Sequence, residues 1–160
     1  MTGTGGEGTR VTGRHARRPD IHLSEQLHNH LTVLTRRTKI THRNALLRWA
    51  FCRSLAEQGK VPPAGYPDSG RPPIAWETFA GDFGDVLWGL LRMRCHADGV
   101  PLDEDTLAAQ FLLHLHRGAG YLVADPRLTD ATGVAGLVQI ALDLGDEAEQ
   151  EQAHADGRLL

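Results

Sequence analysis

Residues 20–57, DIHLSEQLHNHLTVLTRRTKITHRNALLRWAFCRSLAE, predict a short strand followed by two amphipathic helices. Residues 21–23 alternate apolar and polar side chains, as a short strand does. Ser24 is a good N-cap, because its hydroxyl can accept a hydrogen bond from a free backbone N–H of the first turn. The first helix then carries one apolar stripe at helical spacing, made of Leu27, Leu31 and Leu34.

A basic turn, RRTKITHR, separates the two predicted helices. Positive side chains at the end of the first helix suit the negative end of its dipole. Thr41 is the predicted cap of the second helix, which stops by Gly59, and Trp49 lies on its flank. The side chains expected to face inward are Leu46, Leu47, Ala50, Phe51, Ser54 and Leu55.

The remainder of the chain predicts further helices and no sheet. Residues 61–76, VPPAGYPDSGRPPIAW, contain five of the eight prolines and form a surface connection. Residues 76–80 favour a short extended piece. A third helix is expected over 82–97, with Val86, Leu87, Leu90, Leu91 and Met93 as its apolar residues. A fourth opens at the acids 103–105 and weakens at Gly118 and Gly120, and a fifth is expected over 134–144.

The expected architecture is all-α, with a ribbon-helix-helix-like N-terminal unit and two or three further helices. The organisation is a disordered basic leader over 1–19, a helical domain over 20–130, and a helix with an acidic flexible tail over 131–160. No window is long and apolar enough to span a membrane, and the leader lacks the apolar segment of a signal peptide. We therefore expect a soluble, cytoplasmic protein.

Charge is divided unevenly along the chain. From Arg10 to Lys60, eleven Lys and Arg residues face three acids, whereas from Val61 to Leu160 six Arg residues face sixteen acids. The formal net charge of −3 therefore conceals a basic half and an acidic half. Such asymmetry favours a nucleic-acid partner for the basic half.

The strand-helix-helix unit resembles a ribbon-helix-helix module, in which the strands of two chains pair and enter the major groove. Here the exposed strand residues would be Asp20, His22 and Ser24, and the predicted strand has no Arg that could hydrogen-bond to guanine. The basic side chains flank the helices instead, which favours contact with phosphates over sequence readout. The alternative is that Arg36, Arg37 and Arg43 merely solvate a turn.

Four segments together resemble the DndE family of DNA phosphorothioation proteins. They are LTRRTKIT, NALLRWAFCRSLAE, TFAGDFGDVLWGLLRMRCHADG and FLLHLHRGAGYLVAD, and they span roughly residues 21–125. No single piece is diagnostic, but the pieces RRT, CR-SLAE, RCH-DG and HLHRG follow the order and approximate spacing of that family. The glycine-rich leader and the end of the chain after Asp130 lie outside the resemblance.

The resemblance implies an accessory protein that lacks catalytic activity and needs no cofactor. Such proteins are helical homotetramers that prefer nicked double-stranded DNA, and they associate with a sulfur-transfer protein and an ATPase of the same modification system. Outward-facing basic residues form their DNA-binding surface. On this chain that role falls to the basic residues present in the matching region, which are Arg36, Arg37, Lys39, Arg43, Arg48 and Arg53. The chain has only two lysines, so its surface relies on arginine.

Catalytic and metal sites find little support in the sequence. His114 and His116, like His28 and His30, are spaced i, i+2, which places the two rings on opposite faces of a helix. Cys52 and Cys95 sit among apolar neighbours, which favours buried thiols over a disulfide or a persulfide relay. The acids at 82, 85 and 103–105 resemble residues that open helices. We expect no metal site.

Three alternatives to DNA binding by an accessory subunit remain open. In the first, the acidic half, residues 82–130, joins the sulfur-transfer protein and the ATPase, and DNA contact is not essential. In the second, carboxylates that include Asp82 converge on a metal and nick DNA. In the third, the protein represses transcription of its own modification cluster from one promoter site.

Overall fold

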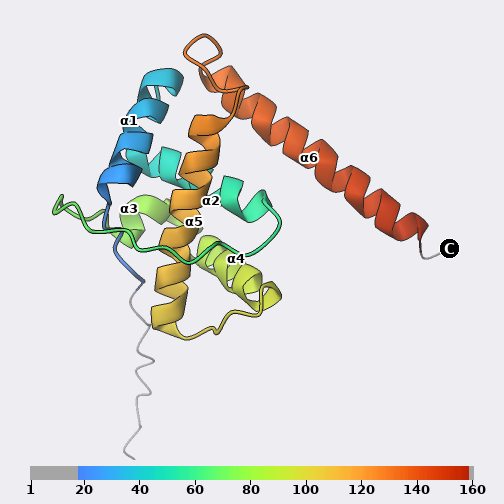
Figure 1. Cartoon of the computed structure of the whole chain (residues 1–160), viewed down its shortest axis with the longest axis horizontal. Coiled ribbons are helices and arrows are strands. Elements are labelled where there is room, and N and C mark those ends of the chain that lie inside the picture. Colours follow the sequence, from blue (N-terminus) through green and yellow to red (C-terminus); the bar gives the residue numbers. More distant parts are fainter. Residues whose placement is uncertain (1–17, 159–160) are drawn as a thin grey trace, which may run out of the picture.

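The computed structural model describes residues 18–158, and within them the chain is helical with no sheet (Figure 1). An all-α fold is therefore confirmed, whereas the predicted leader lies almost wholly outside the described residues. The elements in chain order are α1 (Glu25–Thr38), α2 (Arg43–Ala56), α3 (Trp76–Ala80), the 3-10 turn η1 (Gly81–Phe83), α4 (Gly84–Ala97), α5 (Glu104–Ala124) and α6 (Val134–Gly157).

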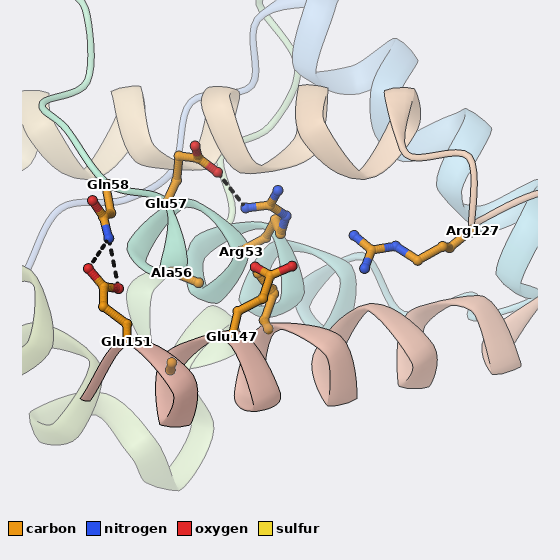
Figure 2. A pocket seen from close by; sticks show the side chains of 9 residues that line it. Arg53, Ala56, Glu57, Gln58, Arg127, Glu147 and Glu151 are labelled. Atoms are coloured by element: carbon orange, nitrogen blue, oxygen red, sulfur yellow. Dashed lines mark hydrogen bonds and ion pairs between the residues drawn. The ribbon is translucent and has the colours of Figure 1, made fainter. Parts of the chain in front are cut away.

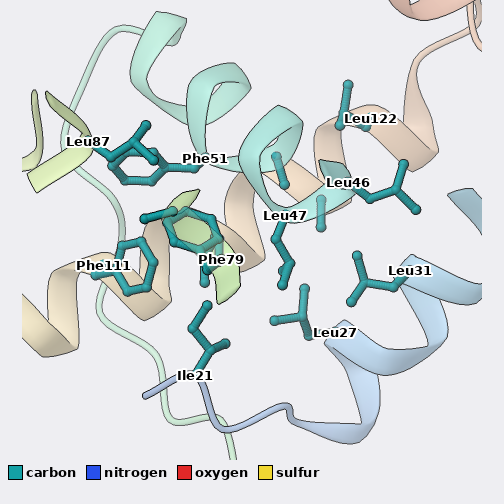
Figure 3. Close-up of a cluster of buried hydrophobic side chains, with 14 of the residues drawn as sticks. Ile21, Leu27, Leu31, Leu46, Leu47, Phe51, Phe79, Leu87, Phe111 and Leu122 are labelled. Carbon is teal, nitrogen blue, oxygen red and sulfur yellow. The ribbon is translucent and has the colours of Figure 1, made fainter. Parts of the chain in front are cut away.

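The core forms where α2 packs against α5, with α1, α3 and α4 around them (Figure 3). Aromatic rings from three of these helices meet edge-on: the Phe79 and Phe111 centroids are 5.2 Å apart, and those of Phe51 and Phe111 are 5.4 Å apart. This geometry places the positive edge of one ring against the negative face of the next. Leu27, Leu31 and Leu34 complete the core from α1 and are wholly buried, as the apolar stripe predicts.

Ser24 caps α1 as predicted. Its Oγ accepts a hydrogen bond from the Leu27 N–H at 3.0 Å. Residues 21–24 do not form a β-strand. They make two isolated antiparallel bridges within the same chain, Ile21 with Ile74 and Ser24 with Asp68. The proline-rich connection is thus held against the start of α1, and strand pairing between two chains stays a prediction.

Two local predictions are wrong. Residues 76–80 are helical, not extended, because Trp76, Phe79 and Ala80 are spaced i, i+3 and i+4 and all three turn into the core. Thr41 is exposed and does not cap α2; the N-cap residue is His42, whose side chain makes no capping hydrogen bond.

α5 continues to Ala124 through both glycines that were expected to weaken it. Gly118 is required where it stands, because a Cβ there would lie 1.6 Å from the carbonyl oxygen of Ala50 on α2. Gly120 has no such constraint, since the nearest atom to a built Cβ is His30 Cε1 at 3.8 Å. The first glycine permits the closest approach of the two central helices.

α6 is longer than the apolar pattern predicts and extends to Gly157, so the acidic residues after Leu144 are helical. Leu137 and Ile140, in the first turns of α6, are buried, whereas every described residue from Gly145 onward is exposed. In Figure 1 the helix runs from the end of α5 to the margin of the molecule. No helix among residues 18–158 is long and apolar enough to cross a membrane.

Candidate nucleic-acid interface

The turn between α1 and α2 presents Lys39 to solvent. Lys39 has a left-handed backbone (φ 63°), and its N–H donates to the Thr35 carbonyl to close α1. Thr38 fixes the turn: its Oγ1 donates to the Leu34 carbonyl at 2.8 Å and accepts from the Ile40 N–H at 3.1 Å. Within the described part of the chain the Lys39 ammonium has no hydrogen-bond or ion-pair partner, so its charge is available to a ligand.

The N-terminus of α2 carries an uncompensated positive end. It has no side-chain cap and no acid in its first turn, whereas α1 has Ser24 with Glu25, and α5 has Asp103, whose carboxylate accepts from the Thr106 N–H at 2.9 Å. The free N–H groups and the helix dipole at such an end attract anions. The α2 terminus therefore adds a directional anion-binding element to the charge of Lys39.

Arg36 lies in the last turn of α1, and Arg43 is the first residue of α2. Arg36 is well exposed and pairs with Asp130 at 3.3 Å, a surface contact of little strength. Arg43 lies 2.8 Å from Nδ1 of His28, which accepts the hydrogen bond. Desolvation, followed by the charge of Arg43, lowers the pKa of His28. We name Arg36, Lys39, Arg43 and the first turn of α2 the basic turn.

The other three predicted DNA-binding residues are bound into the fold. Arg37 Nη1 donates to the carbonyls of Val123 and Leu128, at 2.7 and 3.3 Å, and so closes the end of α5. Arg48 Nη1 donates to the Phe79 carbonyl at 2.6 Å, at the end of α3. Arg36, Lys39 and Arg43 therefore lie near the junction of α1 and α2 in sequence, whereas Arg37, Arg48 and Arg53 contact separate parts of the fold.

Arg53 lines a hollow between α2 and α6 (Figure 2). Its Nη1 donates to Glu57 at 3.0 Å, its guanidinium lies 5.0 Å from the centroid of Tyr121, and its buried Nε has no partner among the described residues. The ionisable residues around it are Glu57, Arg127, Glu147 and Glu151. Carboxylates outnumber guanidinium groups, so this hollow is a poor seat for phosphate.

Arg127 is already neutralised within the same hollow. It pairs with Asp125 and with Asp143, each at 2.7 Å. Hydrogen bonds to these two carboxylates raise the pKa of Arg127 further above its ordinary value. Glu151 in turn accepts two hydrogen bonds from Gln58, at 2.8 and 2.9 Å. These contacts fasten α6 to the body of the protein.

Two arginines outside the predicted DNA-binding set close the C-terminus of α2. Arg117 donates to the Ser54 carbonyl at 2.7 Å and to the Gly59 carbonyl at 3.0 Å. Arg94 donates to the carbonyls of Leu55, at 2.8 Å, and of Gly59. Positive groups at the negative end of a helix stabilise it. No local pattern could predict this, because these partners lie 35 to 63 residues away in sequence.

The paired histidines of α5 contact different helices, as their spacing predicts. His116 Nδ1–H donates to the Leu112 carbonyl at 2.8 Å, so its Nε2 accepts from the Ser24 hydroxyl at 2.7 Å, under the stacked ring of Tyr66. His114 Nδ1 accepts from the Ser54 hydroxyl at 2.8 Å. Both rings are buried and serve the junctions of α5 with α1 and α2.

The two cysteines differ in their surroundings. Both are free; Cys95 is buried as expected, whereas Cys52 is exposed beside Arg48 and Trp49, contrary to the prediction. Desolvation is the largest influence on each thiol and raises the pKa of both, which disfavours the reactive thiolate. Among residues 18–158 no cluster of three His, Cys, Asp or Glu side chains could hold a metal ion.

Comparison with solved structures places the fold in a known class of small helical proteins. The crystal structure of DndE from Escherichia coli B7A, described as involved in DNA phosphorothioation modification, matches with a TM-score of 0.57 and 24% identity, over 67% of this chain and 99% of that one. No match was found among the curated proteins.

The model of the DndE family, described as DNA sulphur modification protein DndE, matches residues 20–130. The chain therefore belongs to the DndE family. That span ends before α6, so the last helix lies outside the match.

Proposed function

We propose that this protein is a non-catalytic accessory subunit of DNA phosphorothioate modification, which binds double-stranded DNA through its phosphate backbone and prefers nicked duplexes. The observation that carries the proposal is the basic turn. In a DndE-family chain, it combines an uncapped helix N-terminus with the free charge of Lys39 and two arginines close to it in sequence. Backbone N–H groups and cations together are the elements with which proteins hold phosphate.

The same mechanism explains why the protein should prefer a nicked duplex. Contacts confined to one turn of each subunit reach successive phosphates only when the duplex bends toward them. Bending an intact duplex costs free energy, and a break in one strand lowers that cost. Subunits repeated by symmetry would present several basic turns to one duplex, so we propose a homo-oligomer, a tetramer in its complete form.

A ribbon-helix-helix contact would supply one interface of that oligomer. The bridge to Ile74 uses the backbone N–H and carbonyl of Ile21. Backbone groups of successive residues in an extended segment point to opposite sides, so those of His22 face the other edge. Pairing of this edge with the same segment of a second copy is the predicted ribbon. We propose that the protein acts in the cytoplasm, with the sulfur-transfer protein and the ATPase as its partners.

The test is a salt titration of binding to intact and nicked duplexes of one sequence, with the double variant Arg36→Gln/Lys39→Asn. Asn tolerates the left-handed backbone at residue 39, so the turn should persist. Each lost phosphate contact lowers the slope of log affinity against log salt by about 0.9, and the double variant should lose about 2.

The matched control is Lys60→Asn, which removes the other exposed lysine and should leave the slope unchanged. Arg37 is left intact because its loss would open the end of α5. Binding by the wild-type protein that does not vary with salt, or equal loss in the control and the double variant, would contradict phosphate contact at the basic turn.

A scaffold role is the second candidate, and one observation favours it. Val134, Val138 and Leu142 are exposed on one side of α6, by 47, 48 and 58%, in a helix that the family match does not include. Co-purification with the sulfur-transfer protein and the ATPase separates the roles. If a variant of the basic turn still binds its protein partners but no longer binds DNA, the scaffold function and the DNA-binding function lie on different surfaces.

A further inference from the structure

α6 has an apolar face that no other part of the described chain covers. Val134, Val138 and Leu142 are all exposed, and we name them the α6 stripe. At about 100° per residue, these three side chains lie within about 80° of one another around the helix. The buried residues Leu137 and Ile140 lie about 100° and 160° from the centre of that sector. The stripe therefore points away from the side of α6 that packs on the protein.

Two acids continue the α6 stripe along the second half of the helix. Glu149 and Asp156 fall within the same sector of about 80°, and both are exposed. Gly145 lies between the stripe and these acids, also in that sector, and nothing lies within 4 Å of a Cβ built on it. One side of α6 is thus apolar in its first half and acidic in its second, with a glycine between them where another backbone can approach closely.

The negative charge of α6 is not balanced on the helix itself. Residues 134–157 contain six acids and no Lys or Arg. Asp146 and Glu149 are spaced i, i+3, and like charges at this spacing destabilise a helix. Glu147 and Glu151 are spaced i, i+4, where the same repulsion acts. A cationic partner would relieve this repulsion, so the charge of α6 specifies the sign of the charge that it can bind.

We propose that the α6 stripe and the acids beyond it bind an amphipathic helix of another protein, whose contact face is apolar in one half and basic in the other. Contiguous apolar side chains on an exposed face mark an interaction site. Helices associate along such stripes, and the charges beside the contact select the partner. The inference rests on the scaffold function, the second candidate above, and names the chemistry of the segment that α6 would hold.

The second half of α6 has few contacts with its own chain. Gln58 donates two hydrogen bonds to Glu151, but every residue from 145 to 157 is exposed, and in Figure 1 this end of the helix lies beyond the other elements. Isolated helices shorter than about 12–15 residues are marginal in water, so packing against a partner would stabilise this stretch. The family match ends at residue 130, so this surface is additional to what the chain shares with the DndE family.

Binding of labelled helical peptides to the full chain, measured by fluorescence anisotropy, tests the proposal. One probe carries leucines in the N-terminal half of one face and lysines in the C-terminal half, and a second probe has the reverse order. Leu142→Lys should raise the dissociation constant of the tighter probe by about tenfold or more, because it places a charge in the apolar contact. The matched control is Leu90→Lys, at an exposed leucine of α4, which should bind the probe as the wild type does.

Two further comparisons separate pairing from general attraction to an acidic surface. A peptide with alanine in place of the leucines should bind much more weakly than the probe. Glu149→Lys should raise the dissociation constant by about two- to fivefold at low salt, and the effect should shrink as salt rises. Glu77→Lys makes the same charge change at an exposed position of α3 and should leave the affinity close to that of the wild type.

The outcomes distinguish this inference from the scaffold function on which it rests. If neither probe binds, if the alanine peptide binds as tightly as the probe, or if Leu142→Lys and Leu90→Lys bind it equally, the α6 contact is overturned. Co-purification of the Leu142→Lys protein with the sulfur-transfer protein and the ATPase then shows whether the scaffold function uses another surface. Probe binding by a wild-type chain that retains neither protein overturns the scaffold function and leaves the α6 contact in place.

Discussion

Most arginines whose contacts are described serve the fold before they can serve a ligand. Arg37, Arg48, Arg94 and Arg117 donate to carbonyl groups at the ends of α5, α3 and α2. Such bonds satisfy carbonyls that a helix leaves unpaired at its last turn. A count of basic residues therefore overstates the phosphate-binding surface, and Lys39, which has no such task, is the more informative residue.

His114 should make stability depend on pH. Desolvation, followed by the charges of Arg117 and Arg94, lowers the pKa of this buried histidine from 6.5 to about 4. Between these values the unfolded chain binds a proton that the folded chain does not, so the free energy of unfolding falls as pH falls through this window. The full effect is about 3 kcal/mol below pH 4.

Chemical denaturation at pH 7.5 and at pH 5 measures this loss. His114→Asn keeps an acceptor for the Ser54 hydroxyl and removes the titrating ring, so its stability should change less between the two pH values. His154→Asn, at an exposed position of α6, should retain the wild-type dependence. Burial lowers the pKa of His116 as well, so some dependence remains in the first variant. An identical dependence in all three proteins would exclude His114 as its source.

At the scale of elements, the seam between α2 and α5 is the least tolerant part of the fold. Gly118→Ala should destabilise the protein by about 3 kcal/mol, because the new Cβ would collide with the Ala50 carbonyl, a backbone group that cannot rotate away. Gly120→Ala, two residues along the same helix, should be neutral or stabilising by up to about 1 kcal/mol. Thermal unfolding of both variants measures the contrast, and equal melting temperatures would refute the close approach.

The difference between predicted and observed elements follows from the range of the interactions. Ser24 and the leucine stripe of α1 were predictable because caps and helical periodicity are local. α3 was not, since its five residues follow a proline-rich run and are helical because three side chains reach a distant core. The full length of α6 was not predicted, because alanine is the only apolar residue type between Leu144 and the end of the helix at Gly157.

The candidate site was predictable in part for the same reason. The charge asymmetry and the position of Lys39 in a turn are visible in the sequence. The sequence does not show that Arg37 and Arg48 are bound into the fold while Arg36 and Arg43 are not. That difference depends on carbonyl partners from α3, α5 and the loop after α5. The missing cap on α2 was also hidden, since Thr41 is a suitable capping residue by type but stands one position too early.

On the scale of the whole molecule, α6 should weaken the attraction of DNA. Ending the chain at Leu144 removes five acids and Arg158, which changes the formal net charge from −3 to +1. Less long-range repulsion should tighten binding to a duplex by a few-fold at low salt, and the gain should shrink as salt rises. Fluorescence anisotropy with a labelled nicked duplex measures both effects.

A full-length control distinguishes charge from shape. Glu147→Gln/Glu149→Gln/Glu151→Gln keeps α6 while removing three of its negative charges, and it should reproduce part of the gain. If truncation tightens binding but the glutamine variant does not, α6 hinders DNA by occupying space. If both bind DNA more weakly, α6 contributes to the interface and the charge argument fails.

The contact between Gly118 and Ala50 also bears on how the protein opens. Two helices that touch backbone to backbone have no layer of side chains between them to loosen first. The amide protons of α2 and α5 at this seam should therefore exchange with solvent only through one shared opening, whereas those of the exposed end of α6 exchange by fraying. The seam between α2 and α5 should then open as one unit, and the exposed end of α6 should open more readily than that seam.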